Sequence, residues 1–257
     1  MATQVPALPV IVTLAQRELV RFFRQRNRVI GALLQPIMFW GLFSAGLRGN
    51  NLGFEFFFPG TITMILLFTA IFATVSIIED RREGFLQSVL VAPAPRWAMV
   101  LGKILGGSVI ALLQAVVFLG LGCATLGMPG SVAEVALSVA LMGVIALALT
   151  GLGFLLAWRM ESSQGFHAIM SVFLFPMWLL SGSLFPDHPQ SWITWLSRFN
   201  PLTYGVAGLR HYLHFNEKLE YALPGLSVCW LVTAVFAVAM VVLSWRIAGT
   251  RTTGDLL

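Results

Sequence analysis

Long apolar runs, each about as long as a bilayer is thick, limit what this chain can fold into. A membrane-spanning helix needs about 20 consecutive apolar residues. Six runs reach that length, at residues 29–47, 56–78, 104–126, 135–158, 166–184 and 223–245. Charged residues make up only 11% of the sequence, whereas soluble domains contain about 25%. The sequence therefore predicts an all-α polytopic membrane protein with six transmembrane helices in one domain, residues 1–257.

The segment between the second and third runs carries a cluster of charges. It opens with five consecutive ones: Glu79, Asp80, Arg81, Arg82 and Glu83. Burying five charges together in a bilayer would cost on the order of 15 kcal/mol. This charged segment, defined here as residues 79–97, is therefore expected to lie in water.

A short amphipathic helix is predicted inside the charged segment. Its apolar positions recur at a helical interval: Phe85, Leu86, Val89 and Leu90. Pro93 should end the helix, because a residue before proline is pushed out of the helical region. Such a helix can serve as a handle for a partner, and the alternative is an ordinary polar turn between two spans.

Basic residues are distributed unequally between the two sides of the predicted spans. If the N-terminus lies inside, the inner side receives Arg17, Arg21, Arg24, Arg26, Arg28, Arg81, Arg82, Arg96, Lys103, Arg159, Arg246 and Arg251. The outer side receives only Arg48, Arg198, Arg210 and Lys218. The positive-inside rule then predicts that both termini and the charged segment lie in the cytoplasm. The chain is expected to be a multi-pass protein of the plasma (bacterial inner) membrane.

Arginines also follow a helical interval before the first run, at Arg17, Arg21, Arg24 and Arg28. Apolar residues fill the opposite side: Val12, Ala15, Leu19, Phe22 and Phe23. The pattern predicts an amphipathic interface helix over about residues 10–28, lying on the membrane surface. It would serve either as a topology anchor or as a protein-binding surface.

Small and aromatic residues inside the runs indicate how the helices pack. The third and fourth runs and their approaches contain Gly102, Gly106, Gly107, Gly120, Gly122, Gly151 and Gly153. Glycines at such spacings predict close helix packing in a compact bundle. Phe68 and Phe72 stand four residues apart in the second run, where they either line a path for an apolar substrate or pack against lipid and neighbouring helices.

The fifth run is expected to be irregular. Pro176 predicts a bend, and the Ser181, Gly182 and Ser183 sequence predicts a break at the outer end. An aromatic-rich segment follows at residues 187–220. Within it, residues 200–212 are apolar but too short to cross, and they predict an outer re-entrant or interfacial helix between spans five and six.

No catalytic or metal-binding motif stands out. Gly102 and Lys103 resemble the end of a phosphate-binding loop, but Trp97 replaces its first glycine and Ile104 its hydroxyl residue. The chain is therefore not expected to hydrolyse ATP by itself. His211 and His214 lack a third ligand, so no metal site is predicted. The basic residues cluster at membrane boundaries, which does not indicate a nucleic-acid partner.

Two groups of residues resemble the signatures of ABC-2 type transporter permeases. The first is similar to the family's cytoplasmic glutamate-glycine loop and comprises residues 79–84, Leu86, Pro93, Gly102 and Lys103. The second comprises Pro176, Ser181, Gly182, Phe185, Pro186, residues 200–204 and Arg210. The resemblance covers nearly the whole chain. Phe85 and Gln87 depart from it, since threonine and glutamate are common at those positions.

The resemblance implies a permease subunit of an exporter, without an ATPase site of its own. Such a subunit pairs with a second copy and with ABC ATPase subunits, which bind ATP and Mg, and the chain itself holds no cofactor. The N-terminal helix and a coupling helix in the charged segment would contact the ATPase. The residues implied are Arg17, Arg21, Arg24, Asp80, Arg81, Arg82, Glu83, Gly84, Phe85 and Leu86. In this hypothesis Phe85, Leu86 and Val89 sit in a groove of the ATPase, and residues 80–83 form the rim.

The substrate path would then run between the two permease copies, with Phe68, Phe72 and Phe175 as predicted lining residues. Spans without charges favour an apolar, amphipathic or neutral cargo, and a drug, a lipid and a glycan all stay open. Two other interpretations are a six-span secondary transporter or channel without an ATPase partner, and a membrane-embedded enzyme. Copurification of a P-loop ATPase would separate the exporter interpretation from these two.

Overall fold

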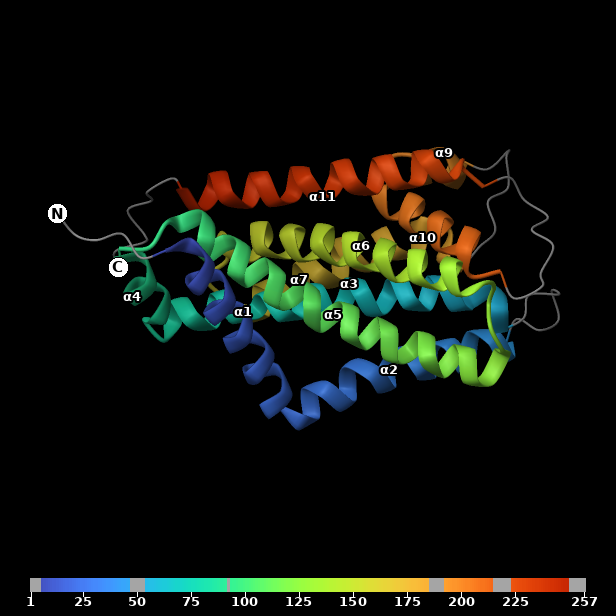
Figure 1. Cartoon of the computed structure of the whole chain (residues 1–257), viewed down its shortest axis with the longest axis horizontal. Helices are drawn as coiled ribbons and strands as arrows, with labels where there is room; N and C mark the ends of the chain where they lie inside the picture. The colour runs from blue at the N-terminus through green and yellow to red at the C-terminus, as the bar shows by residue number, and fades with distance from the viewer. Residues whose placement is uncertain (1–5, 47–53, 92, 185–191, 215–222, 250–257) are drawn as a thin grey trace.

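The computed structural model describes residues 6–46, 54–91, 93–184, 192–214 and 223–249, and this part of the chain is helical and contains no strand (Figure 1). The long helices run side by side as a bundle. Several residues used above lie outside the described ranges: Arg48, Phe185, Pro186, Lys218 and Arg251.

Six stretches of the described chain are long and apolar enough to cross a membrane, as predicted. They belong to α2 (Arg26–Gly46), α3 (Phe54–Arg82), α5 (Arg96–Leu126), α6 (Val132–Trp158), an irregular fifth helix (Ser163–Ser183) and α11 (Leu226–Gly249). The shorter helices are α1 (Ala7–Arg24), α4 (Phe85–Val91), α9 (Trp192–Ser197) and α10 (Pro201–Tyr212). Since α3 continues to Arg82 and α5 begins at Arg96, every charge of the charged segment except Glu83 lies on the end of one of two long helices.

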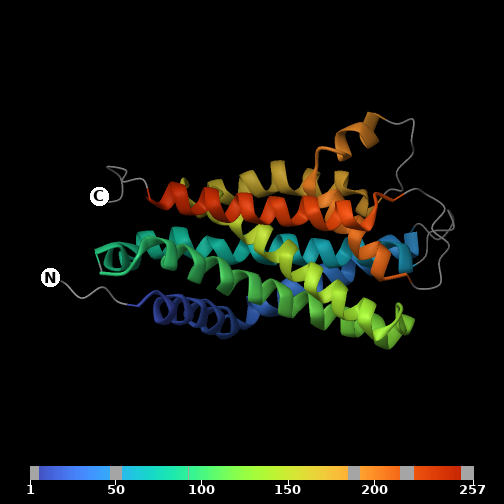
Figure 2. The ribbon, with the colours of Figure 1, turned by 45° about the horizontal axis from the view of Figure 1, so that its top comes forward.

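The two ends of the bundle differ in their short helices. One end carries α4 together with the last turns of α3, α6 and α11 and the first turn of α5, and α1 begins there (Figure 1). We call it the α4 end. The opposite end carries α9 and α10, and α9 stands away from the spans (Figure 2). The rings of Trp195 and Phe199, both exposed, lie 4.9 Å apart on this outlying part.

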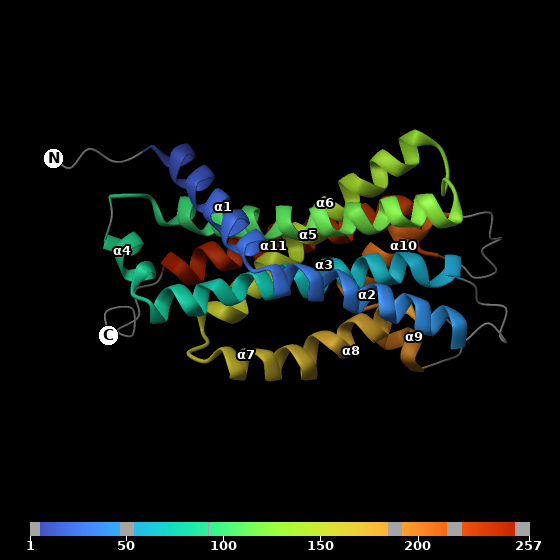
Figure 3. The same ribbon diagram turned by 90° about the horizontal axis from the view of Figure 1, so that it is seen from below.

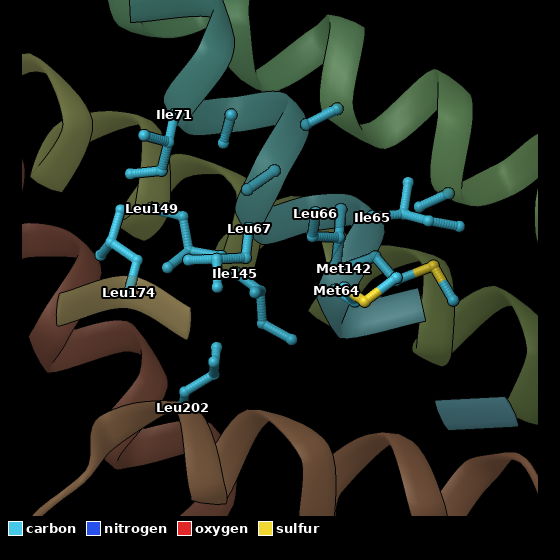
Figure 4. Packing of buried hydrophobic residues seen from close by; sticks show 14 of the residues in the cluster. Met64, Ile65, Leu66, Leu67, Ile71, Met142, Ile145, Leu149, Leu174 and Leu202 are labelled. Carbon is cyan, nitrogen blue, oxygen red and sulfur yellow. The ribbon is translucent and has the colours of Figure 1, made fainter. Parts of the chain in front are cut away.

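Helix α3 lies at the centre of the bundle and supplies much of its core. Its side chains Met64, Ile65 and Leu67 are fully buried. They pack with Met142, Ile145 and Leu149 of α6, while Leu174 and Leu202 approach from the fifth helix and α10 (Figure 4). Lipid tails are as apolar as leucine, so close packing holds such a core together more than exclusion of water does.

Helix α1 crosses α5 and meets α2 in a V whose tip stands out from the bundle (Figures 1 and 3). Its buried face consists of Leu14, Glu18 and Phe22, whereas Val12 and Phe23 of the predicted apolar side are exposed. The predicted helix exists, but it packs on the bundle through a face that includes a glutamate. Residues 26–28 already belong to α2.

Glycines on α5 allow α1 to approach closely, as their spacing predicted. A Cβ atom at Gly102 would lie 2.9 Å from the Cβ of Leu14, and one at Gly106 would lie 2.9 Å from the Cβ of Glu18. On α6, a Cβ at Gly151 would lie 3.0 Å from the Cβ of Met240 on α11. Small residues therefore set the spacing between these helices.

The fifth helix is irregular, as predicted, and lies along the edge of the bundle (Figure 3). It consists of α7 (Ser163–Ile169), the π-helical segment η2 (Met170–Leu174), α8 (Phe175–Trp178) and the π-helical segment η3 (Leu179–Ser183). Pro176 occupies the first turn of α8, where a missing N–H is tolerated. The break falls at Gly182, whose φ of +76° is a conformation that glycine adopts without strain.

Helix α10 forms where residues 200–212 predicted a helix. Asn200 caps it, because its Oδ1 accepts a hydrogen bond of 3.0 Å from the backbone N–H of Leu202. Two side chains also tie α10 to the fifth helix: Asn200 donates to the carbonyl of Met177 at 2.6 Å, and Arg210 donates to that of Gly182 at 2.8 Å. Most of α10 is buried against its neighbours.

We expect Gly106→Leu to destabilise the chain, because the added side chain would collide with α1. Overpacking of this kind costs about 1–3 kcal/mol. Gly120→Leu is the matched control, since nothing lies within 4 Å of a Cβ there on the same helix. Thermal unfolding of both purified variants in one detergent measures the difference, and equal midpoints would contradict the close packing of α1.

Candidate functional site at the α4 end

A cluster of ion pairs joins three helices at the α4 end. Its members are Arg17, Glu18 and Arg21 of α1, Glu79 and Asp80 of α3, and Lys103 of α5. We call these six residues the ion-pair cluster. It contains three cations and three carboxylates, so it is neutral as a whole. Neutrality matters because an unpaired charge would be costly to bury.

The carboxylate of Asp80 lies at the centre of the ion-pair cluster and is completely buried. Arg17 donates to both of its oxygens, at 2.9 and 2.7 Å, in the bidentate geometry that suits a guanidinium. Arg21 donates to Asp80 Oδ1 at 2.8 Å and to Glu79 Oε2 at 2.7 Å. The ammonium of Lys103 donates to Asp80 Oδ2 as well. One side chain of α3 therefore holds both α1 and α5.

Lys103 has a second partner on α1. Its Nζ donates to Glu18 Oε1 at 2.6 Å, and both side chains are almost completely buried. Burial alone would lower the pKa of Arg17, but its hydrogen bond to Asp80 and the charge of that carboxylate raise the pKa above its usual value. Arg17 therefore remains a cation.

The structure corrects the prediction that all five opening charges of the charged segment lie in water. Arg82 and Glu83 are exposed, but Asp80 is not. The reason is that α3 remains helical through this region and turns Asp80 towards α1 and α5. Asp80 is therefore not available as a rim contact for a partner.

Helix α4 forms as predicted but presents a different face. Gly84, with a φ of +74°, makes the turn between α3 and α4. Leu86 is buried, and half-buried Phe85 and Val89 pack against the same core. The guanidinium of Arg17 lies 3.8 Å from the centre of the Phe85 ring. The predicted apolar face is thus used within the chain, and the surface of α4 shows Gln87, Ser88 and Val91.

Three arginines of the charged segment donate to backbone carbonyls near the ends of other helices. Arg81 donates to Trp158 O at 2.6 Å and to Met160 O at 3.3 Å. Arg82 reaches Glu161 O at 3.2 Å. Arg96 donates to Ala248 O of α11 at 3.1 Å. Carbonyls in the last turn of a helix lack intrahelical partners, and arginine complements the helix dipole there. These contacts were not predicted from the sequence, although basic residues beside helix ends are a signal for them.

The third arginine implied for coupling, Arg24, is exposed and has no ion pair among the described residues. It lines a groove of about 430 Å³ beside α1. The other lining residues are Arg17, Val20, Arg21, Gln25 and Glu83.

The predicted lining residues of the substrate path are half-buried. The rings of Phe68 and Phe72 stack on α3 with centroids 6.2 Å apart, and Phe72 lies 5.6 Å from the ring of His167 on α7. Phe175 lies 5.9 Å from the ring of Trp178. The pair on α3 thus lies beside the fifth helix.

The two histidines of the opposite end have separate partners. His211 Nε2 donates to the carbonyl of Pro224 at 2.9 Å, while His214 Nε2 lies 3.3 Å from Glu134 Oε1. In the part of the chain that the structure describes, no three His, Cys, Asp or Glu side chains form a group that could hold a metal ion.

The chain is similar to known transport permeases. The family model described as "ABC-2 type transporter" matches residues 9–214. A probable multidrug ABC transporter permease, YbhR of Escherichia coli K12, is 27% identical over 183 residues, which cover 70% of this chain and 48% of the relative. A putative transport permease of Cyanophora paradoxa, ycf38, is 27% identical over 231 residues, which cover 84% and 79%. The chain spans about half the length of the Escherichia coli relative.

We expect Asp80→Asn to destabilise the chain by about 3–5 kcal/mol, because it leaves buried cations uncompensated. Glu83→Gln is the matched control: that side chain is 61% exposed, and an exposed pair is worth about 0–1 kcal/mol. Adding Lys103→Gln to Asp80→Asn restores neutrality and should recover part of the loss. Thermal unfolding in detergent measures all three, and equal losses for Asp80→Asn and Glu83→Gln would contradict the central role of Asp80.

Proposed function

The chain belongs to the ABC-2 type transporter family, and from that premise we propose that it is the permease subunit of an ATP-driven exporter. It pairs with a second copy of itself and with two ABC ATPase subunits. The ATPase subunits bind ATP and Mg, and the permease pair forms the substrate path. Lys103 stands where a phosphate-binding loop would have its lysine, but its ammonium is buried between two carboxylates. This supports a transport subunit that relies on a separate ATPase.

The observation that carries this proposal is the ion-pair cluster next to α4. A partner that moves α4 displaces the end of α3, and α3 is joined through Asp80 to α1 and α5. Arg81 extends the connection to the end of α6, and Arg96 to the end of α11. A packed and paired assembly moves as a unit, so a local push becomes a shift of several spans.

The proposed contacts with the ATPase follow from what α4 exposes. Gln87, Ser88 and Val91 form the docking surface, with Arg82 and Glu83 at its edge. Phe85 and Leu86 act by seating α4 on the bundle, and Gly84 by making the turn. Arg17 and Arg21 act through Asp80. In this proposal Asp80, Phe85 and Leu86 do not contact the ATPase directly, which differs from the hypothesis based on the sequence.

The proposed substrate path includes Phe68, Phe72 and Phe175. Half-buried aromatic rings keep one side open to a neighbour outside the single chain, which suits a path between two copies. The apolar character of the spans favours an apolar, amphipathic or neutral cargo. The name of the Escherichia coli relative, a probable multidrug permease, agrees with such a cargo.

In the proposed orientation, the α4 end and both termini lie in the cytoplasm and the protein resides in the plasma (bacterial inner) membrane. The distribution of arginines supports it. A secondary transporter or channel would share the six spans but would need no ATPase. Purification from native membranes distinguishes them, because an ABC ATPase subunit should accompany an exporter permease.

Cysteine labelling tests the orientation. In a chain with Cys123→Ala and Cys229→Ala, Ser88→Cys on α4 should resist an impermeant thiol reagent added to intact cells and react after permeabilisation. Met128→Cys, at the other end of α5, should react without permeabilisation. The reversed pattern would show that the α4 end lies outside.

Substitution on α4 tests the docking surface. We expect Val91→Asp to lower the affinity for the ATPase subunit about 30-fold, because losing an apolar anchor at an interface costs about 2 kcal/mol. Met128→Asp, at the opposite end, is the control, since both side chains are exposed. Retention of the ATPase subunit on the purified permease measures binding. Undiminished retention by Val91→Asp would rule out docking through this surface.

A further inference from the structure

A basic groove lies between α1 and the end of α3, next to the proposed docking surface, with which it shares Glu83. Its lining contains three arginines, Arg17, Arg21 and Arg24, and one carboxylate, Glu83. We propose that this groove binds the phosphate group of an anionic phospholipid from the leaflet on the α4 side.

The position of the groove matches the depth of lipid headgroups. Helix α1 ends at Arg24, and the first span begins at Val29. Gln25 interrupts the helix between them, so Arg24 lies within a few residues of the apolar start of the span. That boundary is where the headgroup layer, about 5–7 Å thick on each side of a bilayer, begins. The tip of the V formed by α1 and α2 also stands out from the side of the bundle (Figure 1), the side that a surrounding bilayer would contact.

The arginines have donors left for a phosphate. Arg17 and Arg21 bind carboxylates of α3, yet their side chains remain 30% and 20% exposed. A guanidinium has five N–H donors, so each can bind a second anion, and arginine recognises phosphate particularly well. Arg24 is exposed and makes no ion pair with any described residue.

The charge near the groove favours an anion. Glu83 lies 3.7 Å from Arg21 and is itself largely exposed to solvent. The two carboxylates behind the groove, Glu79 and Asp80, belong to the neutral ion-pair cluster. Glu83 is thus the one carboxylate among the residues that line the groove, against three arginines, so the lining itself is positively charged.

Apolar side chains beside the groove favour a lipid over a soluble anion. Val20 lines the groove and is 52% exposed, and Phe23, next to Arg24, is 54% exposed. Apolar residues next to arginines on a surface helix insert among the acyl chains while the arginines meet the phosphates. A free phosphate would use only the arginines.

The test is a lipid titration of the full-length chain in a neutral detergent, followed by thermal unfolding. Phosphatidylglycerol should raise the unfolding midpoint saturably, because it binds the folded state. Phosphatidylcholine and soluble glycerol 3-phosphate should raise it much less. Arg24→Gln should unfold like the wild type without lipid but need about fivefold more phosphatidylglycerol for half of the effect, equivalent to about 1 kcal/mol for one arginine near an anionic surface.

Two variants control the titration. Arg24→Lys keeps the charge and should retain most of the response. Arg159→Gln removes another exposed arginine at the α4 end and should respond like the wild type. The proposal is overturned if Arg24→Gln and the wild type reach half-saturation at the same lipid concentration, or if glycerol 3-phosphate is as effective as the lipid. Loss of the ATPase subunit from Arg24→Gln with an unchanged lipid response would assign the groove to the protein partner instead. The exporter proposal is judged separately, by copurification of the ATPase.

Discussion

The buried carboxylate of Asp80 determines the arrangement of the α4 end. A carboxylate that is buried away from water must be paired with cations. Here the cations come from two other helices: α1 supplies Arg17 and Arg21, and α5 supplies Lys103. Lys103 in turn requires Glu18, which places the face of Leu14, Glu18 and Phe22 against the bundle. The contact is possible only because Gly102 and Gly106 leave room for the backbone of α1. Charge pairing and small residues thus act together to fix one helix crossing.

The backbone carbonyls that helices leave unpaired are a second constraint, because the bilayer core offers them no water. Near the break in the fifth helix, the carbonyls of Met177 and Gly182 accept hydrogen bonds from Asn200 and Arg210. Trp178 donates to Gly60 O of α3 at 2.9 Å. The irregular segment is therefore held by side chains of neighbouring helices, and its π-helical turns persist within the bundle.

The sequence predicted the spans well because their length is imposed by the bilayer and their composition by its interior. It also predicted α10 and the break at Gly182, since both depend on local signals. It did not predict the burial of Asp80, because its partners Arg17 and Lys103 lie 63 and 23 positions away and no local pattern pairs residues over such separations. For the same reason the apolar face of α4 was assigned to a partner, although Leu86 packs within the chain. The orientation of the chain and its coupling to an ATPase depend on a membrane and on other subunits, so they stay predictions from the sequence.

The pairing of Glu18 with Lys103 also has a consequence for biosynthesis. The two residues are 85 positions apart, and ribosomes add about 5–20 residues per second. For about 4–17 s after Glu18 is made, its buried partner does not yet exist. Helix α1 is translated before α3 and α5, and its ion pair with α5 can form only after Lys103 has been made. Helix α1 therefore cannot reach its final set of contacts while α3 and α5 are still missing.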